Sequence, residues 1–202
     1  MFKNRFISFE GIEGCGKSTQ ARILYEYFLA RQMKCLLTRE PGGSVAGEKI
    51  REILLSEQIE KLTPQAELLL NFAARVEHVD KTIKPALSAG KMVICDRFFD
   101  SSYAYQGKAM NLGYDMVNQL RKITLDDFMP DITFFIDVKV DEAAARIVNR
   151  QDNNRYEKLT KDFHQKVYDG FLELAKNNSR IIMIDGSKNP QEVFQQIIKF
   201  IN

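Results

Sequence analysis

The chain has 202 residues, which at roughly 150 residues per domain predicts a single domain over residues 1–202. Hydrophobic residues make up 45% and charged residues 28% of the sequence, so disorder, collagen and coiled coil are excluded as descriptions of the whole chain. The 29 basic and 27 acidic residues leave a net charge of +2, too balanced to indicate a nucleic-acid polymer as partner. No membrane partner is expected, because no run approaches the roughly 18 apolar residues of a membrane span.

In chain order, the first apolar run is residues 6–9, which ends at Gly11. Apolar residues recur at helical spacing beyond Lys17, so the sequence predicts strand, glycine loop and helix. A second strand is predicted at 35–38, followed by the turn 41–43 and a helix around 50–54. Thr63 and Pro64 then begin a helix that we expect to reach Gly90 with a bend at Pro85.

Three more strands are predicted at 92–95, 132–136 and 181–184, with helices at 114–126, 141–150, 157–177 and 191–201. The strands are apolar on both faces, as a sheet covered by helices on two sides requires. The alternation of strands and helices indicates an α/β fold of three layers with a five-stranded parallel sheet. In such a fold the functional loops lie at the carboxyl ends of the strands.

The glycine loop matches the phosphate-loop pattern G-x-x-x-x-G-K-[ST] and is followed by Thr19. Its glycines let backbone N–H groups turn toward a phosphate at the positive end of the following helix. Lys17 reaches the β and γ phosphates, and Ser18 is a natural Mg²⁺ ligand. A plain glycine turn between strand and helix needs neither residue. The cofactor prediction is therefore a nucleoside triphosphate with Mg²⁺, held by Gly11, Ile12, Glu13, Gly14, Cys15, Gly16, Lys17, Ser18 and Thr19.

The residues directly after the third predicted strand indicate the class of phosphate-loop protein. A GTPase switch would carry an Asn-Lys-x-Asp motif, which is absent, and a motor ATPase usually has Asp followed by Glu. Here Asp96 is followed by Arg97, so Asp96 can hold Mg²⁺ while Arg97 binds the phosphate of an acceptor. Taken singly, Asp96 reads as a helix cap and Arg97 as a surface ion pair. Together, at the end of a central strand, they favour a kinase site.

Two phosphorylated substrates bring several negative charges together, and further arginines in the sequence could neutralise them. Arg39 follows the second strand, and Arg146, Arg150 and Arg155 flank the polar stretch 151–154. We expect a lid at approximately 150–156 that places Arg150 and Arg155 over the transferring group, rather than an ordinary solvated loop. Arg146 is expected instead to be buried in its helix face or ion-paired.

Four segments together resemble the thymidylate kinase family, and the match runs from Phe6 to the last predicted helix. They are residues 9–19, the run Thr-Arg-Glu-Pro-Gly-Gly at 38–43, Asp-Arg-Phe at 96–98, and Ser-Ser-Tyr-Ala-Tyr-Gln-Gly at 101–107. The resemblance implies the phosphate-loop kinase fold, transfer of the ATP γ-phosphoryl group to dTMP in dTTP biosynthesis, and a homodimer. Gly14 in the loop is similar to the members whose catalytic arginine lies in the lid. Phe98 and Cys15 depart from the usual Tyr and from the usual Ala or Ser.

The resemblance also implies roles for individual residues around dTMP. Arg39 and Arg97 would hold its phosphate, Phe72 would stack on thymine, and Arg75 would hydrogen-bond a base carbonyl. Sequence alone favours a core position for Phe72, and it leaves simple packing for Tyr105 and a helix cap for Ser101 open as alternatives. The remaining implied substrate contacts are Ser101 and Ser102 at the base edge, Tyr105 under the deoxyribose, Glu13 at the 3′-hydroxyl, and Gln106. Lys17, Arg97, Arg150 and Arg155 would be the transition-state cations.

Two other functions stay open at this stage. The chain could act on another monophosphate or on a deoxynucleoside, or it could be a nucleotide sensor without catalysis. The cysteines Cys15, Cys35 and Cys95 form no CxxC pair, as expected of reduced thiols, and the sequence from Met1 leads into a strand rather than a signal segment. A cytoplasmic protein is therefore expected, with Cys15 as a possible modification site if the helix N-terminus favours its thiolate.

Overall fold

The structure is a computed structural model, and it describes residues 5–147, 155–156 and 159–201. Five parallel strands form one sheet in the order β2-β3-β1-β4-β5. Their bounds are β1 Phe6–Glu10, β2 Cys35–Arg39, β3 Met92–Asp96, β4 Ile132–Asp137 and β5 Ile181–Asp185. The predicted strands and parallel sheet are confirmed. The chain turns to one side of β1 for β2 and β3 and to the other side for β4, which places a ligand-binding switch point at the carboxyl end of β1.

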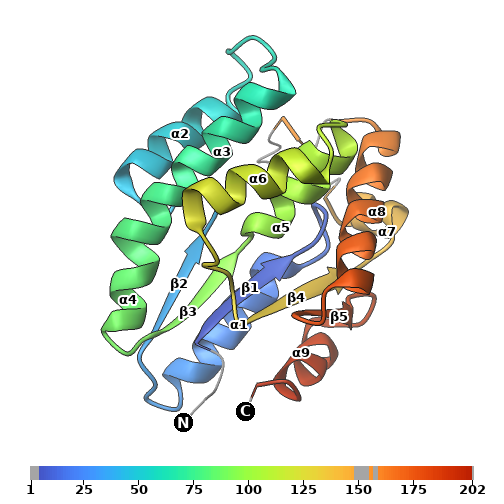
Figure 1. Cartoon of the computed structure of the whole chain (residues 1–202). Coiled ribbons are helices and arrows are strands. Elements are labelled where there is room, and N and C mark those ends of the chain that lie inside the picture. Colours follow the sequence, from blue (N-terminus) through green and yellow to red (C-terminus); the bar gives the residue numbers. More distant parts are fainter. Residues whose placement is uncertain (1–4, 148–154, 157–158, 202) are drawn as a thin grey trace.

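Helices cover both faces of the sheet and make the predicted three layers (Figure 1). On one face α1 (Lys17–Leu29) and α9 (Pro190–Ile198) pack together. The other face carries α3 (Pro64–His78), α5 (Phe99–Ser102), α6 (Tyr114–Leu125) and α8 (Lys161–Asn177). Helix α2 (Val45–Leu55) packs on α3, and α7 (Val140–Ile147) packs on α8. No described helix is long and apolar enough to cross a membrane.

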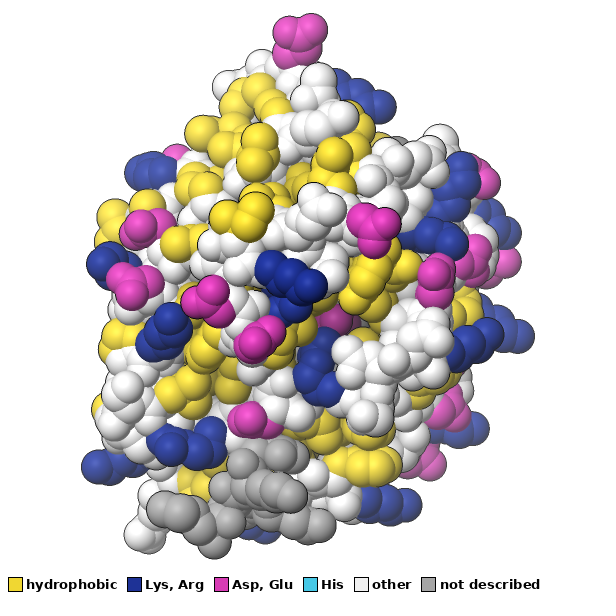
Figure 2. All heavy atoms as spheres, viewed as in Figure 1, with side chains coloured by type: hydrophobic (Ala, Val, Ile, Leu, Met, Phe, Trp, Pro, Cys, Tyr) yellow, Lys and Arg dark blue, Asp and Glu magenta, His cyan; other side chains and the backbone are white. Residues whose placement is uncertain are grey.

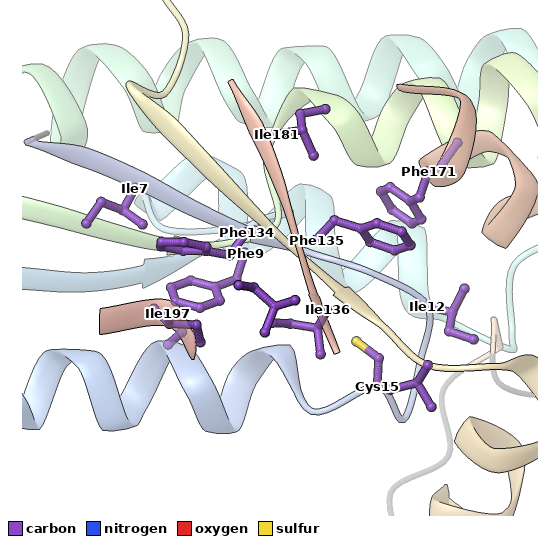
Figure 3. Packing of buried hydrophobic residues seen from close by; sticks show 14 of the residues in the cluster. Ile7, Phe9, Ile12, Cys15, Phe134, Phe135, Ile136, Phe171, Ile181 and Ile197 are labelled. Carbon is purple, nitrogen blue, oxygen red and sulfur yellow. The ribbon is translucent and has the colours of Figure 1, made fainter. Parts of the chain in front are cut away.

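Neighbouring phenylalanines of β4 show how the sheet is held between its helical layers (Figure 3). Successive strand residues point to opposite faces. Phe134 packs against Phe9 of β1, with ring centroids 5.4 Å apart, on the face that Ile197 of α9 covers. Phe135 stacks at 5.4 Å on Phe171 of α8. Each fully buried side chain of this size contributes roughly 1.5–3 kcal/mol, so both faces of β4 stabilise the centre of the sheet.

The helix predicted from Thr63 to Gly90 is divided into three parts. Thr63 caps α3 as predicted, its hydroxyl accepting from the Ala66 N–H at 3.3 Å. A π-helical segment, η1 (Val79–Ile83), then joins α3 to α4 (Lys84–Ser88). Pro85 lies in the first turn of α4, where its missing N–H does least harm, so the irregularity falls before the proline rather than at it.

Other helix ends also differ from the predictions. The helix expected from 157 begins at Lys161, because Thr160 caps it by accepting from the Phe163 N–H at 3.2 Å. Asn189 caps α9, which begins at Pro190 and ends at Ile198 rather than at 201. Helix α7 is described to Ile147, and residues 148–150 lie outside the described residues. The short α5 and the π-helical η2 (Tyr103–Ala109) were not predicted, and both line a cleft at the carboxyl end of the sheet.

Candidate active site

The phosphate loop joins β1 to α1 and has the backbone that its glycines allow. Gly14 and Gly16 have φ values of 80° and 96°. A Cβ at Gly14 would lie 2.3 Å from the Ala143 carbonyl oxygen of α7, so no other residue fits there without displacing backbone. Lys17 is 7% exposed, and its Nζ donates to the Ile12 carbonyl at 3.2 Å. The loop thus cradles its own lysine at the positive end of α1.

The cleft at the carboxyl end of the sheet brings most of the predicted site residues together. Its walls come from the phosphate loop, α2, α3, η2 and the segments after β2 and β3. The predicted residues that line it are Glu13, Gly14, Lys17, Ser18, Arg39, Arg75, Asp96, Arg97, Ser101, Ser102, Tyr105 and Gln106. Glu40, Pro41, Arg51, Leu55, Asn71, Phe98 and Tyr156 complete the lining.

Arg97 lines the cleft and is held there by several hydrogen bonds. It has a left-handed backbone, with φ of 70°. Its guanidinium donates to the Gly11 carbonyl at 3.0 Å, to Ser101 Oγ at 3.1 Å and to Glu13 at 2.8 Å. Burial acts to lower the pKa of Arg97, but Tyr105, Glu13 and Asp96 raise it above the ordinary value. Arg97 therefore stays charged, and in turn Arg97 and Lys17 outweigh burial and lower the pKa of Glu13.

Two further arginines line the cleft together with Arg97. Arg39 is half exposed and pairs with Glu48 at 2.8 Å, whereas the Arg51 guanidinium donates to the Pro41 carbonyl at 2.9 Å. Burial and the nearby charge of Arg39 lower the pKa of Arg51, with Arg97 adding to the effect. Such mutual repulsion is relieved by a bound anion. Arg51 was not among the predicted residues, although it follows the buried Gly47 by four residues and precedes the buried Leu54 by three.

Asp96 carries an atom that a cation would satisfy. Its Oδ1 is buried and has no hydrogen-bond partner among the described residues. Ser18 lines the same cleft, so a carboxylate and a hydroxyl oxygen are available together. Hard oxygen donors of this kind suit Mg²⁺, which keeps several of its waters. These residues fit the predicted metal.

The deeper wall is organised by a buried ion pair. Arg75 is 2% exposed, and its Nε donates to Glu40 at 2.6 Å. The other guanidinium nitrogens donate to Ser102 Oγ at 3.0 Å and to the Phe98 carbonyl at 3.1 Å. Phe72 lies behind this group, 1% exposed, with its ring centroid 4.8 Å from the Arg75 guanidinium. The structure therefore does not bring Phe72 to the cleft, and its neighbour Asn71 lines the wall instead.

Of the lid predicted at approximately 150–156, the structure describes Arg155 and Tyr156. Arg150 and residues 151–154 lie outside the described residues. The Arg155 guanidinium donates to Glu67 of α3, whose other oxygen accepts from Gln106 at 2.7 Å. Arg155 thus meets α3 and not the phosphate loop, while Tyr156 lines the cleft. Gln106 contributes to this wall as expected.

A second cavity lies on the other flank of the phosphate loop, toward α9. Gly14, Cys15, Gly16, Thr19 and Gln20 line it, together with Arg146, Gly186, Lys188, Pro190 and Val193. The Arg146 guanidinium pairs with Glu142 at 2.5 Å, as expected, and also donates to the Gly186 carbonyl at 2.9 Å. Lys188 and Gly186 follow β5 and were not predicted as site residues. The sequence signal for a role of these two residues is their position directly after the last predicted strand, at the carboxyl end of the sheet.

The three cysteines are free thiols. Cys15 is 1% exposed, and burial raises its pKa despite the opposing charge of Lys17. The structure therefore favours the neutral thiol of Cys15 over the thiolate that would make it a modification site. Burial raises the pKa of Cys95 as well, and Cys35 is the most accessible of the three.

Glu10, at the end of β1, makes a testable contribution to stability. Burial and the Asp100 carboxylate raise its pKa to about 8. Between its ordinary value of 4.5 and 8, the folded protein holds a proton that the unfolded chain releases, so stability falls as pH rises through this window. We expect the free energy of unfolding of the wild type, minus that of Glu10→Gln, to decrease over this window and to level off above it. Urea unfolding across pH measures this difference, and a flat or rising difference would contradict it.

The phosphate loop, the arginines that line the cleft and the cavities on the two flanks of the loop define a phosphate-loop kinase. The thymidylate kinase family model matches residues 9–197. The curated thymidylate kinase of Mycoplasma capricolum is 45% identical over 199 residues, which are 97% of this chain and 93% of that protein. That of Rickettsia typhi is 44% identical over 201 residues, 98% of each chain. A crystal structure of thymidylate kinase from Ehrlichia chaffeensis matches with a TM-score of 0.80 at 37% identity and covers 96% of both chains.

The chain belongs to the thymidylate kinase family. It is a nucleoside monophosphate kinase, and the reaction of its family is phosphoryl transfer to dTMP. The resemblance predicted from the four sequence segments is thereby confirmed.

Proposed function

We propose that the phosphoryl donor is ATP and that its phosphates lie in the phosphate loop. Lys17 would neutralise the β and γ phosphates, and the N–H groups of residues 11–19 would bind their oxygens. The second cavity, beside Thr19 and Arg146, would take the nucleoside half of the donor. Its position on the flank of the loop away from Arg97 keeps donor and acceptor on separate sides of the transferring group.

Ser18 and Asp96 would hold Mg²⁺ beside these phosphates. When bound, the ion supplies positive charge to the phosphate oxygens. The orphaned Asp96 Oδ1 supports this assignment.

The convergence of Arg39, Arg51 and Arg97 is the observation that carries the acceptor assignment. Bringing two phosphates within about 4 Å costs about 4 kcal/mol for each pair of unit charges at an effective dielectric constant of about 20. An unphosphorylated acceptor would not require three arginines on the wall opposite the donor. The phosphate of dTMP is already an anion, so no general base is needed, and these side chains act by positioning and charge neutralisation.

The base of dTMP would lie toward Arg75 and Ser102, with Asn71 in the wall between them and α2. Phe72 would support Arg75 from behind rather than stack on thymine. Tyr105 and Glu13, whose side chains are hydrogen-bonded at 2.5 Å, would face the deoxyribose. For Arg155 to act as a transition-state cation, as we propose with Arg150, it has to exchange Glu67 for the phosphoryl group.

Steady-state kinetics with a panel of acceptors tests this assignment. With ATP and Mg²⁺, we expect kcat/KM for dTMP to exceed that for dUMP by about 10- to 200-fold, the range that one methyl group supplies in a pocket. Thymidine, which lacks the phosphate, should give no measurable turnover. Preferential use of thymidine would contradict the role given to the arginines.

We also propose a homodimer formed through α3 and α6, in a reducing compartment such as the cytoplasm that suits three free thiols. Leu69 of α3 is 57% exposed, and Tyr114, Met116 and Ile123 of α6 are 47%, 44% and 80% exposed. Hydrophobic side chains gather over these helices in Figure 2. Light scattering should give twice the mass of one chain, and Ile123→Asp should shift the distribution toward the monomer. A monomeric wild type at micromolar concentration would contradict the proposal.

A further inference from the structure

We propose that Glu10 is a positioning residue for the acceptor phosphate, because its buried carboxyl group holds the turn that aims Arg97 into the cleft. This inference rests on the role of Arg97 in the proposed function. Glu10 is the last residue of β1, is fully buried, and lines neither the cleft nor the second cavity. It therefore acts on the site only through its neighbours.

The turn after β3 needs support, because Arg97 adopts a conformation that side chains rarely occupy. Its φ of 70° is typical of glycine, and a residue with a Cβ is strained there. The following residue, Phe98, has φ −149° and ψ −143°. Left without restraints, such a backbone would relax toward a commoner conformation and swing the guanidinium away from the cleft.

Glu10 supplies the restraints on the side of the turn that follows Arg97. Its Oε1 accepts from the Phe98 N–H at 2.7 Å and from the Ser101 N–H at 3.3 Å. Its Oε2 is hydrogen-bonded to Ser101 Oγ at 2.6 Å. On the preceding side, the Arg97 N–H donates to the Phe9 carbonyl at 2.9 Å. The end of β1 therefore fixes both ends of the left-handed turn.

The same strand end also contacts the Arg97 side chain. One guanidinium nitrogen donates to the carbonyl of Gly11 and to the hydroxyl of Ser101, and that hydroxyl is hydrogen-bonded to Glu10. Glu10, Ser101 and Arg97 thus form one hydrogen-bonded chain, buried at its inner end and open to the cleft at its outer end. The nearby carboxylate of Asp100 takes no part, because Arg180 occupies it at 2.7 and 2.9 Å.

The distinguishing experiment is the affinity for dTMP and for ATP, measured separately by calorimetry on variants of the full chain. Glu10→Leu removes the three hydrogen bonds that Glu10 makes to the turn, and we expect it to weaken dTMP binding by about tenfold or more while ATP binding changes by less than about threefold. Glu10→Gln retains an oxygen that can accept from Phe98 and Ser101, so it should restore dTMP affinity to within about threefold. If Glu10→Leu does not fold, Glu10→Asp, which shortens the reach by one methylene, should show the same preferential loss.

Ser8→Ala is the matched control, because Ser8 lies on the same strand and loses a buried hydrogen bond to Thr133, 2.5 Å long, without touching the turn. It should lower stability without separating the two affinities. In an Arg97→Ala background, Glu10→Leu should add nothing to the loss of dTMP affinity.

The outcomes separate this inference from the function on which it rests. If Arg97→Ala leaves dTMP affinity unchanged, the role proposed for Arg97 fails. If Arg97→Ala weakens dTMP binding but the folded Glu10 variants do not, or weaken dTMP and ATP equally, the positioning role of Glu10 is overturned.

Discussion

Arg97→Ala is expected to lower kcat/KM for dTMP by about 10²- to 10³-fold, the usual effect of removing one preorganised donor from a reacting centre. The Gly11 carbonyl and the Ser101 hydroxyl hold the Arg97 guanidinium in the cleft, so it would keep its position when the acceptor phosphate replaces Glu13 as its anionic partner. A coupled assay for ADP formation at varied dTMP measures the effect.

Arg97→Lys serves as the matched variant. Lysine keeps the positive charge but lacks the planar fork, so we expect it to recover only a small part of the lost activity. Circular dichroism should show that both variants are folded, because each leaves Glu13 without part of its ion pair. A loss of less than about threefold in Arg97→Ala would mean that Arg97 is not a principal ligand of the phosphate.

Glu40→Ala should reduce the free energy of unfolding by about 3–5 kcal/mol, because it leaves a buried arginine without its counter-ion. Arg75 and Glu40 have side chains only 2% and 3% exposed, and the second oxygen of Glu40 is hydrogen-bonded to His78 at 3.0 Å. His78 in turn is bonded to Thr38 at 2.7 Å, so the loss extends to β2. Urea unfolding followed by circular dichroism measures the change.

Two comparisons make this result specific. Glu52→Ala breaks the exposed pair with Lys49, whose side chains are 74% and 65% exposed, and should cost less than about 1 kcal/mol. Combining Glu40→Ala with Arg75→Met should be less destabilising than Glu40→Ala alone, because the unpaired charge is gone. Equal effects of Glu40→Ala and Glu52→Ala would refute the assignment of a buried, energetically coupled pair.

The sheet and the phosphate loop could be predicted because their physical requirements are local. A strand covered on both faces must be apolar throughout, as Phe134 and Phe135 show by packing on opposite layers. The glycines of the loop have no substitute where the backbone is left-handed or meets α7. Both constraints are visible in a few consecutive residues.

The side chains contributed by helices could not be placed in the same way. Asn71 and Phe72 are neighbours on α3, and only the packing of the helix decides that Asn71 lines the cleft while Phe72 supports Arg75. In the sequence, Arg51 cannot be distinguished from any other helix arginine. Its place in the cleft depends on the packing of α2 beside the turn at Pro41. The position of Arg155 on Glu67 joins residues 88 positions apart, a distance over which sequence spacing carries no signal.

The ion pair between Arg97 and Glu13 affects the free energy of acceptor binding. The guanidinium already has an anionic partner, so under the proposed function the arriving phosphate would have to displace a carboxylate rather than bind an unpaired cation. The affinity for the acceptor would then reflect the difference between two counter-ions, which would keep it moderate and allow the product to leave. The displaced carboxylate of Glu13 would lie within the same cleft, free to accept a hydrogen bond from a sugar hydroxyl. One ion exchange would thus couple recognition of the phosphate to recognition of the sugar.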